Sequence, residues 1–303
     1  MSFSANIKKE LSRAASARTC CARAELCGIL LFASSLERSS VRIQTHNPLL
    51  LKHLGIVCER AMGYTPSWSA SVTGSRHTIS LDDPGDMERI FSVLGYEYRD
   101  QLVLHLNAPL VEDDCCRAAF LRGAFLTGGY VTDPERDYSL EFTTTHAVLS
   151  RELYALLCDM GMPPKTAKRR YTNVVYFKGS EAIEEILTLM GAPRAAMSIM
   201  ETKVIKDVRN TINRKVNCET ANLLRSVENG NIQLEAIAAL KAAGRYEELP
   251  IRLKEAAELR ERFPDAPLSE LAQNADPPIT KSGLNHRLKK IEQLYSEMHG
   301  EGK

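Results

Sequence analysis

Two stretches of the sequence decide the fold: CCARAELCG at residues 20–28 and CCRAAFLRG at residues 115–123. They are copies of one pattern at an offset of 95 residues, each with a cysteine pair at its start and a glycine at its end. Further matches follow at similar offsets, with Thr45-His46 repeated at 145–146 and Gly95 at 191. Small changes of offset fall in loops, where insertions cost little free energy. The first two hundred residues are therefore an internal duplication.

Each half shows the same order of elements. An apolar segment with a central glycine comes first, and alternating residues at Val41–Thr45 and Tyr138–Thr143 then predict strands. Helices should begin near Asn47 and His146 and end at Gly63 and Gly161. Further strands are predicted at 68–72 and 78–81 and at 169–171 and 174–178, with last helices at 84–94 and 180–190. The prediction is an α+β fold in which αββαββα occurs twice.

This duplicated order resembles the LAGLIDADG homing-endonuclease fold. The resemblance implies that the two glycine-bearing helices pack against each other at a pseudo-twofold axis and that the paired sheets form a saddle over duplex DNA. Gly28 and Gly123 take the matching positions, where the absence of a side chain lets two backbones approach closely. We expect a pseudo-dimer within one chain.

The nuclease motif of that family ends in a carboxylate that holds a divalent metal. Here Ala33 and Gly128 take those positions, and neither has a side chain that ligates a metal. The nearby acids Glu37, Asp133, Glu135 and Asp137 are typical of solvated turns. We predict a protein without catalytic residues, metal or cofactor. An active metal-dependent endonuclease is the least favoured alternative.

Eight cysteines and seven histidines could in principle bind a metal. The cysteines have no CxxC pattern and no zinc-finger spacing, and adjacent cysteines form disulfides poorly. We therefore expect small buried apolar side chains in a reducing compartment. His46 and His146, equivalent in the repeat, are expected to be packed or capping groups rather than ligands.

Composition and charge narrow the class of protein. The chain has 303 residues, of which 44% are hydrophobic and 25% charged, as in ordinary globular proteins. No apolar run reaches the roughly 20 residues of a membrane span, and the N-terminus lacks a secretory signal, so we expect a cytoplasmic protein. The net charge is +1, but basic residues cluster at 165–170, 203–215 and 281–290. Such clusters suit phosphate contacts, although each could also be a solvated helix face.

Beyond residue 200 the pattern becomes helical. Val204, Val208, Ile212 and Val216 recur at helical spacing, and Asn229-Gly230 is expected to interrupt the helix. We interpret 201–245 as a helical linker that partly packs on the neighbouring domain. Its Arg209 and Arg214 could contact DNA phosphates or simply be solvated.

The last segment predicts a helix-turn-helix. A helix at Ile251–Arg262 is followed by a short helix at Leu268–Gln273, a proline-containing turn, and a long helix capped by Thr280 or Ser282 that runs to about Met298. Leu284, Leu288, Ile291 and Leu294 form its apolar stripe. The polar start of such a helix fits the major groove of DNA.

Three motifs make the whole chain similar to the WhiA family: LSELA at 268–272, PPITKSGLNHRL at 277–288 and RNTINRKVNCETAN at 209–222. The resemblance implies a degenerate LAGLIDADG-like domain at 1–200 (halves 1–105 and 106–200), the linker, and a helix-turn-helix domain at 246–303 similar to sigma-factor region 4. It also implies a noncatalytic, nucleoid-associated regulator of transcription, with roles in sporulation or in cell division and chromosome segregation.

The resemblance implies sites as well. Residues carried over as reading double-stranded DNA are Lys281, Ser282, Asn285, His286 and Arg287, with Lys289 and Lys290 on phosphates. Secondary DNA contacts could come from Lys165, Lys168, Arg169 and Arg170 of the saddle. The saddle could instead bind protein. A protein-interaction adaptor of the transcription or division machinery therefore remains an alternative function.

Overall fold

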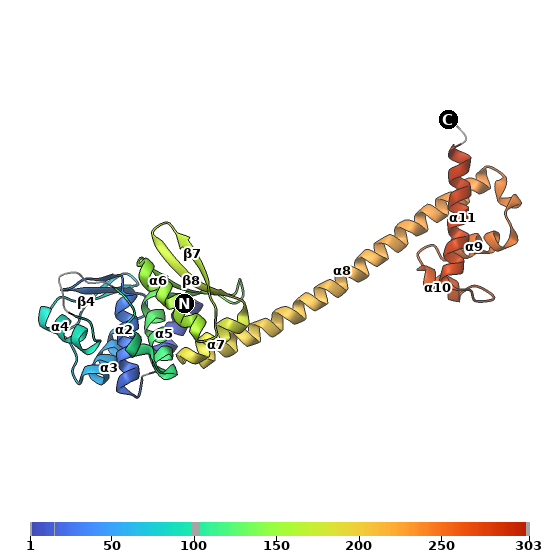
Figure 1. Ribbon diagram of the computed structural model, residues 1–303. Coiled ribbons are helices and arrows are strands. Elements are labelled where there is room, and N and C mark those ends of the chain that lie inside the picture. Colours follow the sequence, from blue (N-terminus) through green and yellow to red (C-terminus); the bar gives the residue numbers. More distant parts are fainter. Residues whose placement is uncertain (1, 15, 98–103, 301–303) are drawn as a thin grey trace. The chain divides into compact units, whose positions relative to one another are not determined.

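The computed structural model describes residues 2–14, 16–97 and 104–300 (Figure 1). Two compact units divide the chain, at residues 1–206 and 207–303. In the described part of the chain, no helix combines the length and the apolar character needed to cross a bilayer.

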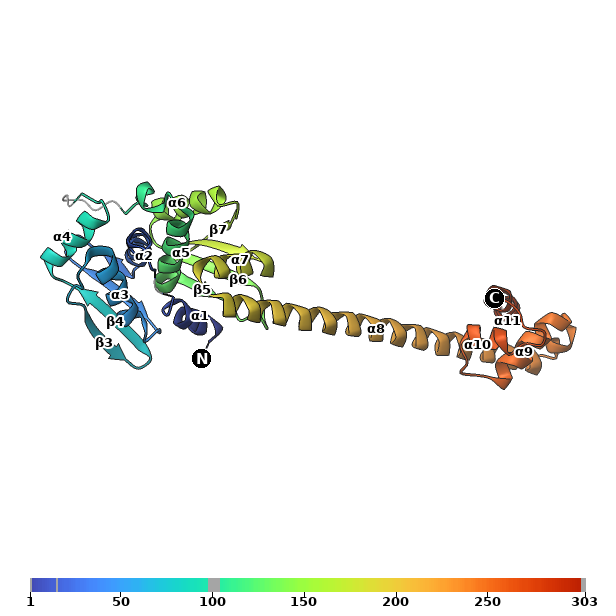
Figure 2. The same ribbon diagram turned by 90° about the horizontal axis from the view of Figure 1, so that it is seen from below.

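Two helices form the centre of the first unit. Helices α2 (Thr19–Leu31) and α5 (Asp114–Gly128) lie side by side in both Figures 1 and 2, and most of their residues are buried. A methyl group at Gly28 would overlap the carbonyl oxygen of Phe120 and lie 2.8 Å from the amide nitrogen of Ala124. Gly123 meets the backbone of Glu25 and Ile29 in the same way. The predicted glycine-mediated helix crossing is confirmed, and its cause is direct backbone contact.

Each repeat adds a four-stranded antiparallel sheet to this centre. The first sheet has the order β1-β2-β4-β3, and the second has the matching order β5-β6-β8-β7. The strands of the first are β1 (Ser35–Leu36), β2 (Val41–Thr45), β3 (Ser69–Thr73) and β4 (Arg76–Leu81). Those of the second are β5 (Gly129–Val131), β6 (Ser139–Thr144), β7 (Lys165–Arg169) and β8 (Thr172–Lys178). Helices α3 (Leu50–Met62), α4 (Pro84–Val93), α6 (Ala147–Asp159) and α7 (Ser180–Met190) complete the repeats.

The predicted αββαββα order and its duplication are confirmed. Helix α1 (Phe3–Leu11) precedes the first repeat, and the Ser2 hydroxyl caps it by accepting a hydrogen bond from Ala5 N. Gly63 ends α3 in the left-handed conformation, with a φ of 74°. This is the chain-stop role that the sequence predicts for this glycine.

One strand was placed wrongly by the sequence. The strand expected at 169–171 is β7 at Lys165–Arg169, and the chain turns at Arg170, whose φ is 54°. All residues of β7, an edge strand of its sheet, are exposed, so neither face of the strand packs on the core. It therefore has no apolar alternation to show in the sequence, and its lysines and arginines are typical of an exposed edge.

A buried ionic network joins the two repeats at the central helices. The Glu25 carboxylate, fully buried on α2, accepts hydrogen bonds from Arg122 of α5 at 2.8 and 2.9 Å and pairs with His53 Nε2 of α3 at 2.6 Å. Ser16 donates a further hydrogen bond at 2.7 Å. Burial acts to raise the pKa of Glu25, but the hydrogen bonds from His53 and Arg122 outweigh it and leave that pKa below its usual value.

Helix α8 (Pro193–Ala242) runs through the expected linker without a break. The predicted interruption at Asn229-Gly230 is wrong. Gly230 is buried, and a side chain on it would press against the carbonyl oxygen of Pro264 at 3.1 Å. The glycine thus lets the loop before α10 pack closely on the helix, and its helix-breaking tendency of about 1 kcal/mol is overridden by that packing.

The apolar stripe on α8 does not mark a packed face. Val204, Val208, Ile212 and Val216 are each more than half exposed. The expectation that this part of the helix packs on a neighbouring domain is wrong for these residues. Farther along, Ala236, Ile237 and Leu240 are buried and enter the core of the second unit.

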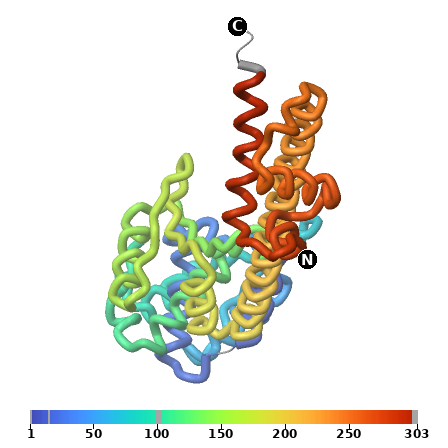
Figure 3. The backbone as a smooth tube through the Cα atoms, turned by 90° about the vertical axis from the view of Figure 1, so that its right-hand side faces the viewer, coloured from blue at the N-terminus to red at the C-terminus, as the bar shows by residue number. Residues whose placement is uncertain are grey.

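The second unit is a small helical bundle. It consists of the end of α8, the 3-10 helix η2 (Arg245–Glu248), α9 (Ile251–Arg262), α10 (Leu268–Gln273) and α11 (Lys281–Gly300). The predicted bounds of α9 and α10 are confirmed. Leu271, Leu284, Leu288 and Ile291 close the core. In Figure 3 the red helix α11 runs beside the orange segments that contain the end of α8 and α9.

A buried arginine holds this bundle together. Arg260 of α9 is 1% exposed and donates hydrogen bonds to Gln233 Oε1 of α8 at 3.0 Å and to the carbonyl oxygens of Pro264 and Ala266 at 3.2 and 2.8 Å. Gln233 in turn donates to Glu292 of α11 at 3.0 Å. Burial lowers the pKa of Arg260 from its usual value. No motif in the sequence indicates this role, because the partners come from three separate segments.

Candidate nucleic-acid interface

The start of α11 is fixed by hydrogen bonds of the cap residue Thr280 and of the turn before it. Thr280 caps the helix by accepting a hydrogen bond from Gly283 N at 3.1 Å, and its carbonyl oxygen accepts from Leu284 N at 3.0 Å. Before it, Ile279 N donates to Ala272 O at 3.1 Å, which ties the turn to α10. The helix N-terminus thus presents its positive end and free N–H groups beside Lys281, an arrangement that attracts phosphate.

The two faces of α11 have opposite characters. Leu284, Leu288 and Ile291 are buried against the bundle. Ser282, His286 and Lys289 follow at spacings of four and three residues on the opposite, exposed face. Lys281 and Lys290 are also exposed. We call Ser282, His286 and Lys289 the outer ridge of α11.

Asn285 and Arg287 flank this ridge. Both are half-buried, and the Arg287 guanidinium lies 3.5 Å from the Glu255 carboxylate of α9. An arginine that leans toward a carboxylate on its own unit is less available to a base edge than the expectation from sequence implies. The side chains best placed to meet a groove are therefore those of the outer ridge.

The basic residues of the second sheet do not form one patch. Strand alternation puts Lys165 and Arg169 on one face of β7 and Lys168 on the other, while Arg170 lies in the turn. Arg169 is already paired, with both guanidinium nitrogens donating to Glu141 of β6 at 2.8 and 2.9 Å. This pairing raises the pKa of Arg169. Within the cluster at 165–170, the positive charge of Arg169 is therefore offset by a neighbouring carboxylate, and Lys165, Lys168 and Arg170 are exposed.

Helix α8 presents two exposed surfaces. Arg209 and Arg214 are exposed, as are Asn210 and Asn213, and these four side chains spread over a broad arc of the helix, because residues five apart lie about 140° apart around it. Val204, Val208, Ile212 and Val216 form an exposed apolar stripe that borders Arg209 and lies away from Arg214. Arg209 and Arg214 are positioned so that they can contact phosphates. The valines and Ile212 of the stripe stay exposed to solvent.

Ala33 and Gly128, the two positions where the LAGLIDADG resemblance leads one to expect acids, lie where the central helices end. Ala33 follows the last turn of α2, and Gly128 is the last residue of α5. A side chain at Gly128 would lie 2.8 Å from Thr143 O and 2.9 Å from the ring of Phe32. The buried Phe32 ring packs edge-on against Phe120 and Phe142, with centroids 6.4 and 6.5 Å apart. Beyond lacking a ligand, position 128 thus has no room for a carboxylate.

The nearby acids are engaged in local contacts. Asp133 accepts a hydrogen bond from Glu135 N at 3.0 Å, and Asp137 pairs with Lys178 at 2.8 Å. Glu37 is exposed and accepts from Ser35 at 3.4 Å. The contacts of Asp133 and Glu37 are local ones of the kind that the sequence predicts, whereas Asp137 pairs with a residue 41 positions away.

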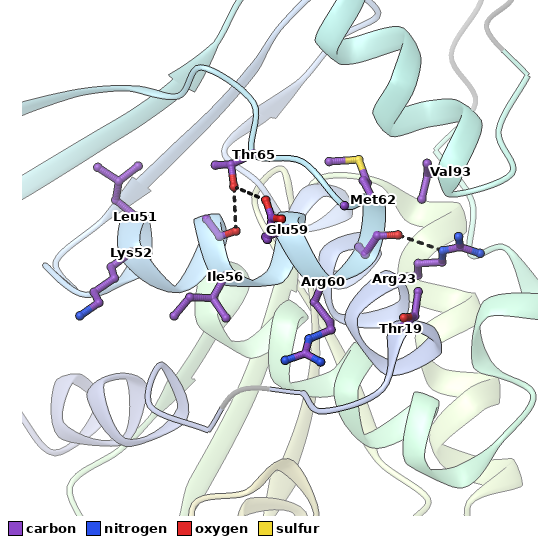
Figure 4. Close-up of a pocket in the computed structure, with 13 residues that line it drawn as sticks. Thr19, Arg23, Leu51, Lys52, Ile56, Glu59, Arg60, Met62, Thr65 and Val93 are labelled. Atoms are coloured by element: carbon purple, nitrogen blue, oxygen red, sulfur yellow. Dashed lines mark hydrogen bonds between the residues drawn. The ribbon is translucent and has the colours of Figure 1, made fainter.

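A pocket of about 900 Å³ follows α3 and the start of α2 (Figure 4). Arg23 donates from its Nε to Ala61 O at 3.2 Å, and Thr65 bonds both Gly55 O and Glu59 at 3.3 Å. Lys52 and Arg60 line the wall as well. Arg23, Arg60 and Glu59 make hydrogen bonds within the protein, and Lys52 points away from the other lining residues in Figure 4. We assign no ligand to this pocket.

The cysteines were the feature most misjudged from sequence. Four are buried, as expected, but Cys20 and Cys218 are exposed and Cys115 and Cys158 are half-buried. The expectation of buried apolar side chains holds for Cys21 and Cys116 of the two duplicated pairs but is wrong for Cys20 and Cys115. Cys20, Cys21, Cys115 and Cys116 bring their sulfur atoms within 4.8 Å of one another. This cluster could have been predicted from the sequence, since the two cysteine pairs occupy equivalent positions of two helices that are expected to cross.

Comparison with known proteins gives a consistent result. Residues 117–209 match the family model of the WhiA LAGLIDADG-like domain, and residues 212–295 match that of the WhiA C-terminal HTH domain. The chain is 33% identical over 320 residues to the probable cell division protein WhiA of Alkaliphilus metalliredigens, covering 99% of both chains. It is 37% identical over 314 residues to the same-named protein of Desulforamulus reducens, covering 98% of this chain and 96% of that one.

A solved structure shares the fold. The crystal structure of full-length WhiA from Thermatoga maritima matches with a TM-score of 0.59 at 24% identity, covering 98% of this chain and 99% of that one.

Proposed function

The chain belongs to the WhiA family, and we propose that it is a noncatalytic DNA-binding regulator of transcription that acts in cell division and chromosome segregation. The names of the relatives, probable cell division proteins, support the cellular role. We propose a cytoplasmic, nucleoid-associated location, because duplex DNA is the expected partner. The absence of room for a carboxylate at Gly128 supports the noncatalytic part.

One observation supports DNA binding above the others: the outer ridge of α11. It combines a capped helix start, exposed Ser282 and His286, and the cations Lys281, Lys289 and Lys290 on a helix held by a buried core. Side chains on such a ridge can reach base edges in the major groove, and the lysines can contact phosphates. Asn285 and Arg287 take flanking positions in this proposal, and Arg209 and Arg214 of α8 give secondary phosphate contacts.

The test separates base reading from phosphate contact. Genome-wide occupancy mapping identifies a target duplex, and fluorescence anisotropy then measures affinity for the target and for an unrelated duplex over a range of salt. His286→Ala should weaken target binding about tenfold and leave unrelated DNA nearly unchanged, since a base contact is worth roughly 1–3 kcal/mol. Lys289→Ala should weaken both and lower the salt slope by about one.

Lys254→Ala is the matched control, because Lys254 lies in the same unit but is paired with Glu247 at 2.7 Å. Unchanged target affinity and salt slope in both ridge variants would remove α11 from this role. Incubation of the same protein with plasmid and Mg²⁺ tests the noncatalytic part. Site-specific cleavage by the purified protein would contradict it.

A second candidate function, a protein-interaction adaptor, is favoured by the exposed stripe of Val204, Val208, Ile212 and Val216. A stripe of this kind is typical of helices that dock on a partner. A pull-down that survives nuclease treatment and fails when Val208 and Ile212 are replaced by Ser, with DNA binding intact, would support this function.

A further inference from the structure

The four clustered cysteines have the geometry of a metal site. All ligand sulfurs of Cys20, Cys21, Cys115 and Cys116 lie within 4.8 Å of one another, and those of the neighbours Cys20 and Cys21 are 4.0 Å apart. A zinc–sulfur distance of about 2.3 Å in a tetrahedron places the sulfurs roughly 3.8 Å apart. Small side-chain rotations therefore bring the cluster to coordination distance. Disulfide bonds would instead require the sulfurs to approach to about 2.05 Å in pairs.

Positively polarised groups lie close to the four sulfur atoms. Cys20 and Cys21 lie in the first turn of α2, and Cys115 and Cys116 lie in the first turn of α5. The N-cap residues of these helices, Arg18 and Asp113, make no side-chain capping hydrogen bond. The positive ends of two helices therefore face the four sulfurs, and the Arg18 guanidinium lies 3.8 Å from Cys115 Sγ. Four thiolates on a divalent ion leave two negative charges, which the helix ends and Arg18 offset in part, while Asp113 and Asp114 at the start of α5 act in the opposite sense.

We propose that Cys20, Cys21, Cys115 and Cys116 bind a single zinc ion that links the two repeats. Zinc is the ion that tetrahedral sets of four cysteines most often hold in structural sites. An iron–sulfur cluster distributes its cysteines over more than one iron atom, so the close mutual spacing favours one ion. Cys21 and Cys116 are buried, whereas Cys20 is exposed and Cys115 half-buried, so an ion can enter from solvent.

The place of the site in the fold gives it a structural role. The ligands come in pairs from the starts of the two helices whose glycines cross, so the ion ties one repeat to the other. This inference is independent of DNA binding by α11. The chain lacks finger-type spacing because the duplication, rather than a local loop, brings the ligand pairs together.

The experiment uses the full-length protein, purified under reducing conditions and passed over a desalting column. Elemental analysis should find about one zinc per chain, and cobalt added to the metal-free protein should give the strong visible bands of a tetrahedral thiolate site. Cys20→Ser with Cys115→Ser should abolish both signals, because it removes one ligand from each repeat at the solvent side. Cys158→Ser with Cys218→Ser is the matched control and should retain them.

Circular dichroism shows whether the ligand variant folds, and the wild-type cobalt titration stands without it. Failure of folded, fully reduced wild-type protein to take up zinc or cobalt would overturn the proposal. Retention of the metal in the ligand variant would overturn it as well. Peptide mapping that finds a disulfide among these four residues in protein purified without reductant, and no metal in the reduced form, would assign the cluster to redox chemistry instead.

Discussion

The two units of the molecule both bury a charged side chain, but they balance it differently. In the first unit, Glu25 faces two side chains that can carry the opposite charge, His53 and Arg122. In the second, Arg260 donates hydrogen bonds to the neutral oxygens of Gln233, Pro264 and Ala266. The first arrangement joins two sequence repeats through ion pairs, and the second joins three segments through hydrogen bonds alone.

The comparison shows that the units should fail under different conditions. The first contains a carboxylate whose pKa differs from its usual value, so acid should weaken it. The second depends on an arginine that stays charged at any ordinary pH, so its core should respond to truncation rather than to pH. Three predictions test this difference.

The largest effect is expected at the helix crossing of the first unit. Gly28→Ala places a methyl group against the backbone of Phe120 and Ala124, and neither backbone can move without separating α2 from α5. We expect a loss of at least about 3 kcal/mol in the free energy of unfolding, since overpacking against backbone exceeds the usual cost in a core. Urea unfolding followed by circular dichroism measures it.

Gly55→Ala is the control for that substitution. Its nearest neighbour would be the Thr65 methyl group at an ordinary 3.7 Å, and α3 should gain up to about 1 kcal/mol from the better helix former. If Gly28→Ala were as harmless as Gly55→Ala, the close crossing would not support the first unit.

A smaller effect is expected in the second unit. Arg260→Met keeps much of the apolar volume but leaves Gln233 and the partly buried carbonyl oxygens of Pro264 and Ala266 without their donor. We expect a loss of about 2–3 kcal/mol in the stability of this unit, with the first unit unaffected. Arg252→Met, on the exposed face of the same helix, should change stability little. Equal losses in the two variants would show that the hydrogen bonds of Arg260 contribute nothing specific.

The smallest effect concerns pH. The pKa of Glu25 in the folded state lies below the usual 4.5, so its contribution to stability is complete above that value and is lost as pH falls through the folded pKa. Each unit of pKa difference between the folded and unfolded states is worth about 1.4 kcal/mol. Unfolding in urea at pH values from neutral down to about 3 should show this loss in the first unit.

Glu25→Gln should be less stable at neutral pH but should lose less on acidification. Glu59→Gln, an exposed glutamate of α3, is the control and should follow the wild type. A wild-type pH profile unchanged by Glu25→Gln would contradict the role of this network. A comparable acid loss traced to the core of the second unit would remove the difference between the units.

The prediction from sequence succeeded where structure is local. The glycines at 28 and 123 mark the helix crossing that the family resemblance implies. Alternation of apolar and polar residues predicts β2, and prolines and polar residues at the helix ends predict the bounds of α9 and α10. It failed where exposure or packing overrides local preference. Strand β7 is an edge strand without apolar alternation, and Asn229-Gly230 stays helical because Gly230 packs on Pro264.

The candidate site divides in the same way. The sequence places the polar residues at the start of α11, and their spacing already separates Leu284 and Leu288 from His286. It does not show that Arg287 pairs with Glu255 or that Arg169 pairs with Glu141, because these partners lie 32 and 28 residues away along the chain. Pairing across such separations depends on how the elements pack.

What the sequence determined by itself is the duplication, the element order and the apolar faces, because these follow from periodicity and from the conformational range of single residues, while the crossing at the two glycines came from the family resemblance. Only the tertiary structure decided which side chains meet: Glu25 with Arg122, Arg260 with Gln233, and the cysteine pair of one repeat with that of the other. The physical reason is that burial and pairing are properties of surfaces in contact, and contact between distant segments exists only once the chain has packed.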